Sequence, residues 1–106
     1  MRRALADALP EAMKDRDRAK VSALRIALAA VANAEATEAG DGGPQVGVFA
    51  TEVARRSLTD LDVEAIVRET RDELRLASVE MQLLGQAQRA DDLADQVAAL
   101  DAFLGR

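Results

Sequence analysis

Apolar residues recur at helical spacing between Thr59 and Leu104, and this pattern predicts two helices. The first apolar stripe repeats every three or four residues and comprises Val63, Ile66, Val67, Thr70, Leu74, Ala77, Met81 and Leu84. Thr59 stands just before it, where its hydroxyl can cap the first turn. A second stripe follows Gly85 and comprises Leu93, Val97, Leu100 and Leu104. Because glycine tolerates the positive φ that ends a helix, we expect a turn at Gly85 and an antiparallel helical hairpin.

The second half of the first hairpin helix carries another apolar strip beside the main one. This strip consists of Leu76, Val79 and Leu83. A helix with two apolar sides is usually packed between neighbours. We therefore expect this half to contact both the last helix and a helix from the N-terminal part of the chain.

The N-terminal part of the chain predicts two further helices. The first extends from Met1 to about Asp15, and Pro10 lies inside its pattern, where it either kinks the helix or breaks it early. Asp17 is a suitable N-cap for the second, which we expect to end at about Ala36. Apolar residues occupy two sides of this second helix, so we expect it to be packed between neighbouring helices.

A narrow polar strip remains on the second helix. Arg18, Ser22 and Arg25 follow one another at helical spacing, and Asn33 continues roughly along the same line. The simpler interpretation is a solvated edge. The functional interpretation is a small recognition face.

The segment 38–57 interrupts the helical pattern. It contains Gly40, Gly42, Gly43, Pro44 and Gly47. We expect a long flexible loop in which Val48 and Phe49 pack against the hairpin, with a short helix near Thr51 to Arg56 as an addition. A phosphate-binding loop is not favoured, because no Gly-Lys-Ser/Thr follows the glycines.

Composition favours a single all-α domain spanning residues 1–106, with about four helices. The chain is 49% hydrophobic but only 2% aromatic, which predicts a thin core of closely packed helices. No apolar run approaches the roughly 18 residues of a membrane span, so we expect no membrane partner and a cytoplasmic location.

Charge is unevenly distributed along the chain. The formal net charge is −5, yet the first 25 residues hold seven basic and four acidic side chains. A basic start on an acidic body is compatible with a local phosphate contact or with self-association. The candidate nucleic-acid-binding residues are Arg2, Arg3, Lys14, Arg16, Arg18, Lys20 and Arg25.

The residues needed for most catalytic and metal sites are missing from the sequence. The chain has no histidine and no cysteine, which removes the commonest general base and the usual zinc ligands. Ser22 and the other serines have no partner base visible in sequence, and the paired carboxylates fall on predicted caps or outer faces. We therefore expect no metal, no cofactor and no catalytic residue, which indicates a helical interaction module.

The order of several short motifs resembles the first domain of the GatB/YqeY family. The opening motifs are Met13-Lys14-Asp15-Arg16-Asp17, Ser22-Ala23-Leu24-Arg25 and Asn33-Ala34-Glu35. Leu58-Thr59, Ile66, Gly85 and the ending Leu100 to Leu104 resemble the rest of that domain. Members are similar to the tail region of the B subunit of the aspartyl/glutamyl-tRNA amidotransferase.

This resemblance implies a function and a set of residues. It implies the family activity, a carbon–nitrogen ligase with glutamine as amido donor, although the tail region itself helps to hold tRNA. It also implies a polar face of Ser22, Arg25, Asn33 and Glu35. The resemblance covers only the first domain, so we expect no second helical domain to cover Phe103 and Leu104. We therefore expect these two residues to contact another chain in a homo-oligomer, a dimer.

Three functional hypotheses follow. The favoured one is a non-catalytic accessory module that binds tRNA or an amidotransferase-type protein. The alternative is a homo-oligomeric protein-interaction module with no nucleic-acid role. The third, transfer of glutamine nitrogen by this chain alone, is disfavoured because the sequence offers no nucleophile with its base.

Overall fold

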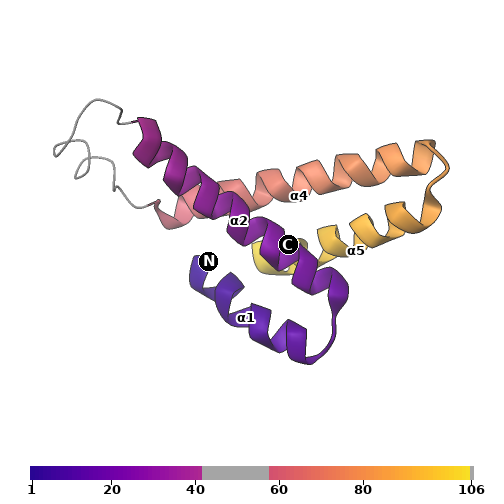
Figure 1. Ribbon diagram of the computed structural model, residues 1–106, viewed down its shortest axis with the longest axis horizontal. Coiled ribbons are helices and arrows are strands. Elements are labelled where there is room, and N and C mark those ends of the chain that lie inside the picture. The colour runs from indigo at the N-terminus through magenta and orange to yellow at the C-terminus, as the bar shows by residue number, and fades with distance from the viewer. Residues whose placement is uncertain (42–57, 106) are drawn as a thin grey trace.

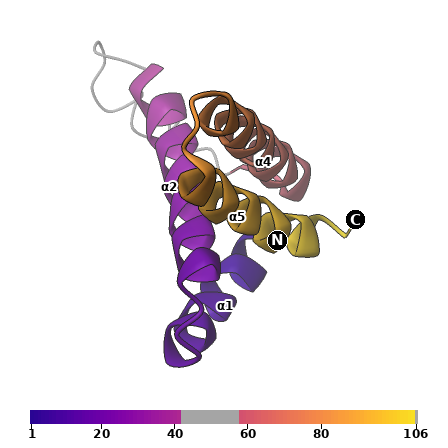
Figure 2. The same cartoon turned by 90° about the vertical axis from the view of Figure 1, so that its right-hand side faces the viewer.

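The fold consists of a helical hairpin crossed by a third helix, with a fourth helix packed alongside the third. The computed structural model describes residues 1–41 and 58–105, and within them there are four helices and no strand. They are α1 (Arg2–Lys14), α2 (Arg18–Asp41), α4 (Asp60–Leu83) and α5 (Ala87–Leu104). Helices α4 and α5 share the largest interface, and α2 packs against α1, α5 and α4 (Figures 1 and 2). The all-α prediction is confirmed.

The hairpin forms because its beginning and its turn are specified locally. Thr59 donates its backbone N–H to Asp62 Oδ2 at 3.0 Å, and Asp62 donates its own N–H to Thr59 Oγ1 at 3.1 Å. This reciprocal pair is a complete capping box at the start of α4. At the other end, Gly85 adopts φ +79°, and Gln86 N–H reaches back to the Met81 carbonyl at 2.8 Å. The predicted cap and turn are both confirmed.

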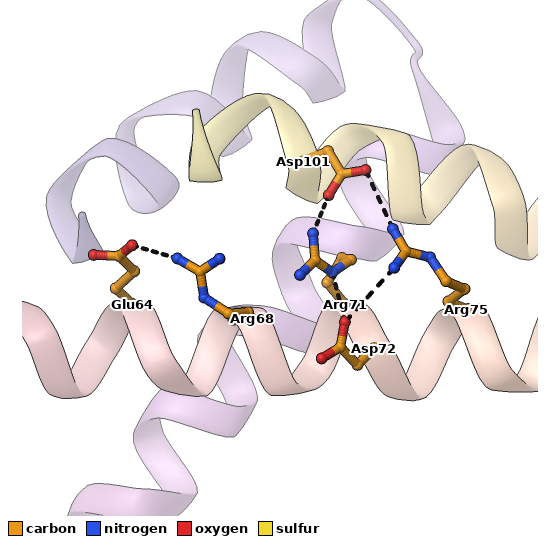
Figure 3. Close-up of polar contacts among 6 residues, drawn as sticks. All are labelled: Glu64, Arg68, Arg71, Asp72, Arg75 and Asp101. Atoms are coloured by element: carbon orange, nitrogen blue, oxygen red, sulfur yellow. Dashed lines mark hydrogen bonds and ion pairs between the residues drawn. The ribbon is translucent and has the colours of Figure 1, made fainter. Parts of the chain in front are cut away.

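Polar contacts connect the hairpin helices at two levels along their length. Ser78 Oγ donates a hydrogen bond to the Ala90 carbonyl at 2.8 Å. Nearer the core, Arg71 on α4 pairs with Asp101 on α5, as Figure 3 shows. These contacts fix the register of the two helices at two separate levels.

The core lies where α2 crosses the hairpin, and every described helix contributes to it. The largest fully buried side chains are Leu5, Leu24, Val67 and Leu100, one from each helix. Alanines fill the close approaches, with Ala12, Ala23 and Ala27 almost completely buried. The prediction that α2 is packed between neighbouring helices is confirmed.

The predicted extent of α1 is close to the observed one, and the predicted end of α2 is wrong. Helix α1 continues through Pro10 to Lys14, so of the two predicted alternatives, a kink or an early break, the early break does not occur. Pro10 is exposed, while Leu5 and Ala12 on either side of it are anchored in the core, and this packing outweighs the one backbone hydrogen bond that proline removes. Helix α2 extends to Asp41 and not to Ala36. The sequence between Ala36 and Asp41 contains no proline, and the single Gly40, which costs about 1 kcal/mol relative to alanine, does not end the helix. The expectations for Val48, Phe49 and Thr51 to Arg56 lie outside the described residues.

The second apolar strip of α4 does not contact the N-terminal helices, contrary to prediction. Helix α2 crosses the hairpin near Val63 and Val67, in the first half of α4, so the second half extends beyond it (Figure 1). Leu76, Val79 and Leu83 consequently remain exposed. Periodicity identified the strip correctly, but which partner covers it depends on where the helices cross.

The last turn of α5 is partly covered by the core of this domain, contrary to the expectation that it is uncovered. Phe103 and Leu104 are half-buried and pack against the core, and the Lys20 ammonium lies 5.9 Å from the centre of the Phe103 ring. Their expected role as an oligomer contact stays a prediction.

Candidate functional site

The turn between α1 and α2 holds an arginine in a backbone conformation that normally favours glycine. Arg16 has φ +59° and is the one non-glycine residue with positive φ in the described chain. Arg16 N–H bonds the Met13 carbonyl at 3.1 Å, and Asp17 N–H bonds the Ala12 carbonyl at 3.0 Å. These two bonds complete a Schellman motif like the one at Gly85. A side chain at this position costs conformational free energy, and such strain is concentrated at functional sites.

The strained turn places Arg16 beside two arginines from the first turns of α2. Asp17 caps that helix, accepting a hydrogen bond from the Lys20 N–H at 3.2 Å. Arg18 and Arg25 then project seven residues apart, which is two helical turns, with Ser22 between them. Together these residues surround an open hollow of about 500 Å³, which we call the arginine hollow. Its lining residues are Met13, Arg16, Arg18, Val21, Ser22 and Arg25.

The arginine hollow is positively charged and contains no carboxylate among its lining residues. In the described part of the chain, Arg16, Arg18 and Arg25 form no ion pair, whereas Arg68 and Arg71 are each paired with a carboxylate. Three guanidinium groups held near one another repel, and an anion bound between them relieves that repulsion. The fork of N–H donors on each guanidinium matches the oxygens of phosphate. The arrangement is therefore suited to binding a phosphate group.

A narrower cleft adjoins the arginine hollow between α2 and α5. It has a volume of about 290 Å³ and is lined by Arg18, Ala19, Ser22, Asp92 and Gln96. Arg18 and Ser22 border both spaces. The Gln96 Oε1 atom beside this cleft is buried and has no hydrogen-bond partner in the described structure. The arginine hollow thus continues into a cleft lined by both donors and acceptors of hydrogen bonds.

The structure divides the predicted basic residues among several places. Arg2 pairs with Glu35, far along α2 from the arginine hollow. Arg3 and Lys14 are exposed on α1 but do not line the hollow, and Lys20 lies over the Phe103 ring. Only Arg16, Arg18 and Arg25 of the seven candidates come together.

The polar face implied by the family resemblance is divided in the same way. Ser22 and Arg25 line the arginine hollow, while Asn33 and Glu35 lie two to three turns further along α2. Sequence reasoning did not find Met13 and Val21 in the lining, nor Gln96 in the cleft. Met13 and Val21 are apolar residues at helical spacing, and this pattern predicts core positions. The position of Gln96 depends on how α5 packs against α2.

Neither a metal site nor a membrane span is found in residues 1–41 and 58–105. No group of three or more carboxylates in these ranges is placed to hold a metal ion. None of the helices described is both long and apolar enough to cross a bilayer.

Comparison with protein-family models, with curated proteins and with solved structures finds no match to this chain.

Proposed function

We propose that this chain is a non-catalytic helical module that binds the phosphate backbone of RNA through the arginine hollow. The observation that carries the proposal is the convergence of Arg16, Arg18 and Arg25 around one open space without a carboxylate. Arginine forks recognise phosphate in pairs of parallel hydrogen bonds, and three of them can contact successive phosphates or clamp one. The resemblance to the GatB/YqeY family suggests tRNA as the RNA, with an amidotransferase-type protein as the associated enzyme.

The charge of the whole chain is consistent with a local RNA contact. The net charge is −5, and an acidic protein surface repels a polyanion. Binding is therefore confined to the arginine hollow, and the number of phosphates neutralised is small. We expect micromolar affinity. The logarithm of the association constant should fall with the logarithm of the salt concentration with a slope of about −2 to −3, because each phosphate contact contributes about −0.7 to −0.9 to this slope.

The ligase activity of the family is not part of the proposal for this chain by itself. Histidine and cysteine are absent from the sequence, and Ser22 in the arginine hollow is surrounded by arginines that cannot act as a base. Glutamine-dependent chemistry would have to reside in a partner protein.

The experiment is tRNA binding by the purified protein across a salt series. Arg18→Glu combined with Arg25→Glu should reduce affinity at least about tenfold. It should also make the salt dependence less steep, by the contribution of roughly two phosphate contacts. Arg3→Glu combined with Lys14→Glu is the matched control, because it changes the net charge equally but lies outside the hollow. We expect the control to lose much less affinity.

Two outcomes would contradict the proposal. If wild-type protein binds no tRNA at low salt, the RNA function is wrong. If the control loses as much affinity as the hollow variant, RNA contacts the whole basic start and the assignment to the arginine hollow is wrong. Glutaminase activity in the pure protein would contradict the non-catalytic part.

A further inference from the structure

The free end of the hairpin exposes a row of large apolar side chains. Leu76, Val79 and Leu83 on α4 are 61%, 51% and 81% exposed, and we call them the hairpin stripe. Helical spacing places them on the side of α4 opposite the buried residues Val63 and Val67. Contiguous apolar surface of this kind in a water-facing position is characteristic of an interaction site.

The spacing of the hairpin stripe is that of a coiled-coil seam. Steps of three and four residues place Leu76 at position a, Val79 at position d and Leu83 at the next a of a heptad. A helix that presents such a seam to water pairs with another helix bearing the same spacing. The partner surface is therefore a helix, and the flanking charges determine which one.

Charges on the two edges of the stripe have opposite signs. Arg68 and Arg75 occupy the g positions, and Glu73 and Glu80 occupy the e positions. Arg75 is half-exposed, and its ion pairs with Asp72 and Asp101 are long, at 3.9 and 3.7 Å (Figure 3). One edge of the stripe is thus basic and the other acidic.

We propose that the hairpin stripe binds the same stripe of a second copy of this chain, with the two α4 helices parallel. In parallel pairing, each g position faces the e position five residues further along the other helix. Arg75 then meets Glu80 of the second copy, twice over by symmetry. In antiparallel pairing, e positions face e positions, so glutamates would meet glutamates. The stripe's own charges therefore fit a parallel copy and oppose an antiparallel one.

The same register limits the contact to the end of the hairpin. Glu69 and Asp72 occupy the preceding a and d positions, where apposed carboxylates repel. Three apolar side chains per copy cover much less than the roughly 800 Å² per partner of a standard interface. We expect weak, reversible association at micromolar or higher concentration. A β-branched residue at d with leucine at a also suits parallel assemblies of more than two chains, in which the same charge contacts form.

The first test is the mass in solution as a function of protein concentration, by sedimentation equilibrium. Wild-type protein should associate, and Leu83→Glu should weaken association about tenfold or more, because it buries an unpaired charge in the seam. Leu61→Glu is the matched control: Leu61 is 77% exposed on the same helix but lies outside the stripe. The control should associate like wild type, and circular dichroism should show unchanged helix content in both variants.

The second test distinguishes the two orientations. Glu80→Arg should weaken a parallel pair, because two cations then meet across the seam. In an antiparallel pair in which Glu80 faces Glu73 of the second copy, the same change should strengthen association, because it turns a glutamate–glutamate contact into an ion pair. Arg75→Glu added to Glu80→Arg should restore parallel association, because it exchanges the two charges.

Three results would overturn the proposal. One is a wild-type chain that stays monomeric at millimolar concentration. This result would overturn the proposal even if the monomer bound an amphipathic helix of another protein through the stripe. Another is association unaffected by Leu83→Glu. The third is association strengthened by Glu80→Arg. None of these bears on the arginine hollow, so the RNA proposal is tested separately.

Discussion

Arg71 on α4 donates a hydrogen bond to Asp101 on α5, with 2.5 Å between Nη1 and Oδ1, and its Nε atom contacts Asp72 at 2.8 Å. The Arg71 side chain is largely covered, so this cross-hairpin bond is more shielded from water than the surface pairs of the chain. Arg75 adds a second, longer contact to the same aspartate (Figure 3). Asp101 therefore anchors α5 to two arginines one turn apart on α4.

Loss of the Arg71–Asp101 bond should lower the melting temperature of the protein. Arg71→Gln and Asp101→Asn should each destabilise, and a double-mutant cycle should show a coupling clearly different from zero. Arg68→Gln is the control, because Arg68 pairs with Glu64 within one exposed helix surface. The control should have a smaller effect, since exposed pairs between neighbouring turns contribute little. Additive effects of the two hairpin changes would contradict a direct interaction.

The same pair should leave stability independent of pH near neutrality. The hydrogen bonds that Arg71 donates to Asp101, and secondly to Asp72, raise the pKa of Arg71 above its ordinary value. A raised pKa contributes stability that is fully present below the unfolded-state pKa and is lost only as pH rises through the still higher folded-state value. The chain also lacks histidine. We expect the melting temperature to change by no more than about 2 °C between about pH 6 and 9. A titration step within that range would contradict this expectation.

The capping box at Thr59 should contribute measurably to the stability of α4. Thr59→Ala removes the acceptor for the Asp62 N–H and should reduce the free energy of unfolding by about 1 kcal/mol in urea denaturation. Thr59→Ser keeps an oxygen at the same position and should retain most of the stability. Equal losses in the two variants would show that the threonine methyl group, and not the hydroxyl, supplies the effect.

Replacement of Gly85 should lower the free energy of unfolding because of its backbone conformation. A Cβ atom added there would meet nothing within 4 Å, so the penalty of Gly85→Ala comes from φ +79° alone. We expect a loss of about 1 kcal/mol in the free energy of unfolding, because alanine is disfavoured in the left-handed region. Gly85→Asn should lose less, since asparagine visits that region more readily. A neutral Gly85→Ala would indicate that the turn relaxes to another conformation.

Sequence reasoning located the features that depend on neighbouring residues. The cap at Thr59, the cap at Asp17 and the turn at Gly85 each follow from a few adjacent side chains, and each was predicted. The break at Pro10 was not found in the structure, because anchoring of Leu5 and Ala12 in the core outweighs local propensity.

Features that depend on packing could not be predicted in this way. The helical pattern showed that Leu76, Val79 and Leu83 share a face but could not show that α2 crosses α4 before reaching them. Likewise, seven basic residues were candidates, and only the strained turn at Arg16 and the helical phase of α2 decide which three converge. A positive φ at an arginine leaves no sequence signal, because glycine is the residue that marks such turns.

The strain at Arg16 should be separable from its proposed role in binding. Arg16→Gly places the residue that the Schellman motif prefers at φ +59° and relieves roughly 1–2 kcal/mol of conformational cost. Added freedom in the unfolded chain offsets about 0.4–1 kcal/mol of that gain. We therefore expect the free energy of unfolding to rise by about 0.5–1 kcal/mol in urea, while tRNA affinity falls because one guanidinium leaves the arginine hollow. Arg16→Lys should keep both the strain and the positive charge, and so should bind more tightly than Arg16→Gly while remaining less stable. If Arg16→Gly gained stability without losing affinity, Arg16 would have no part in the phosphate contact.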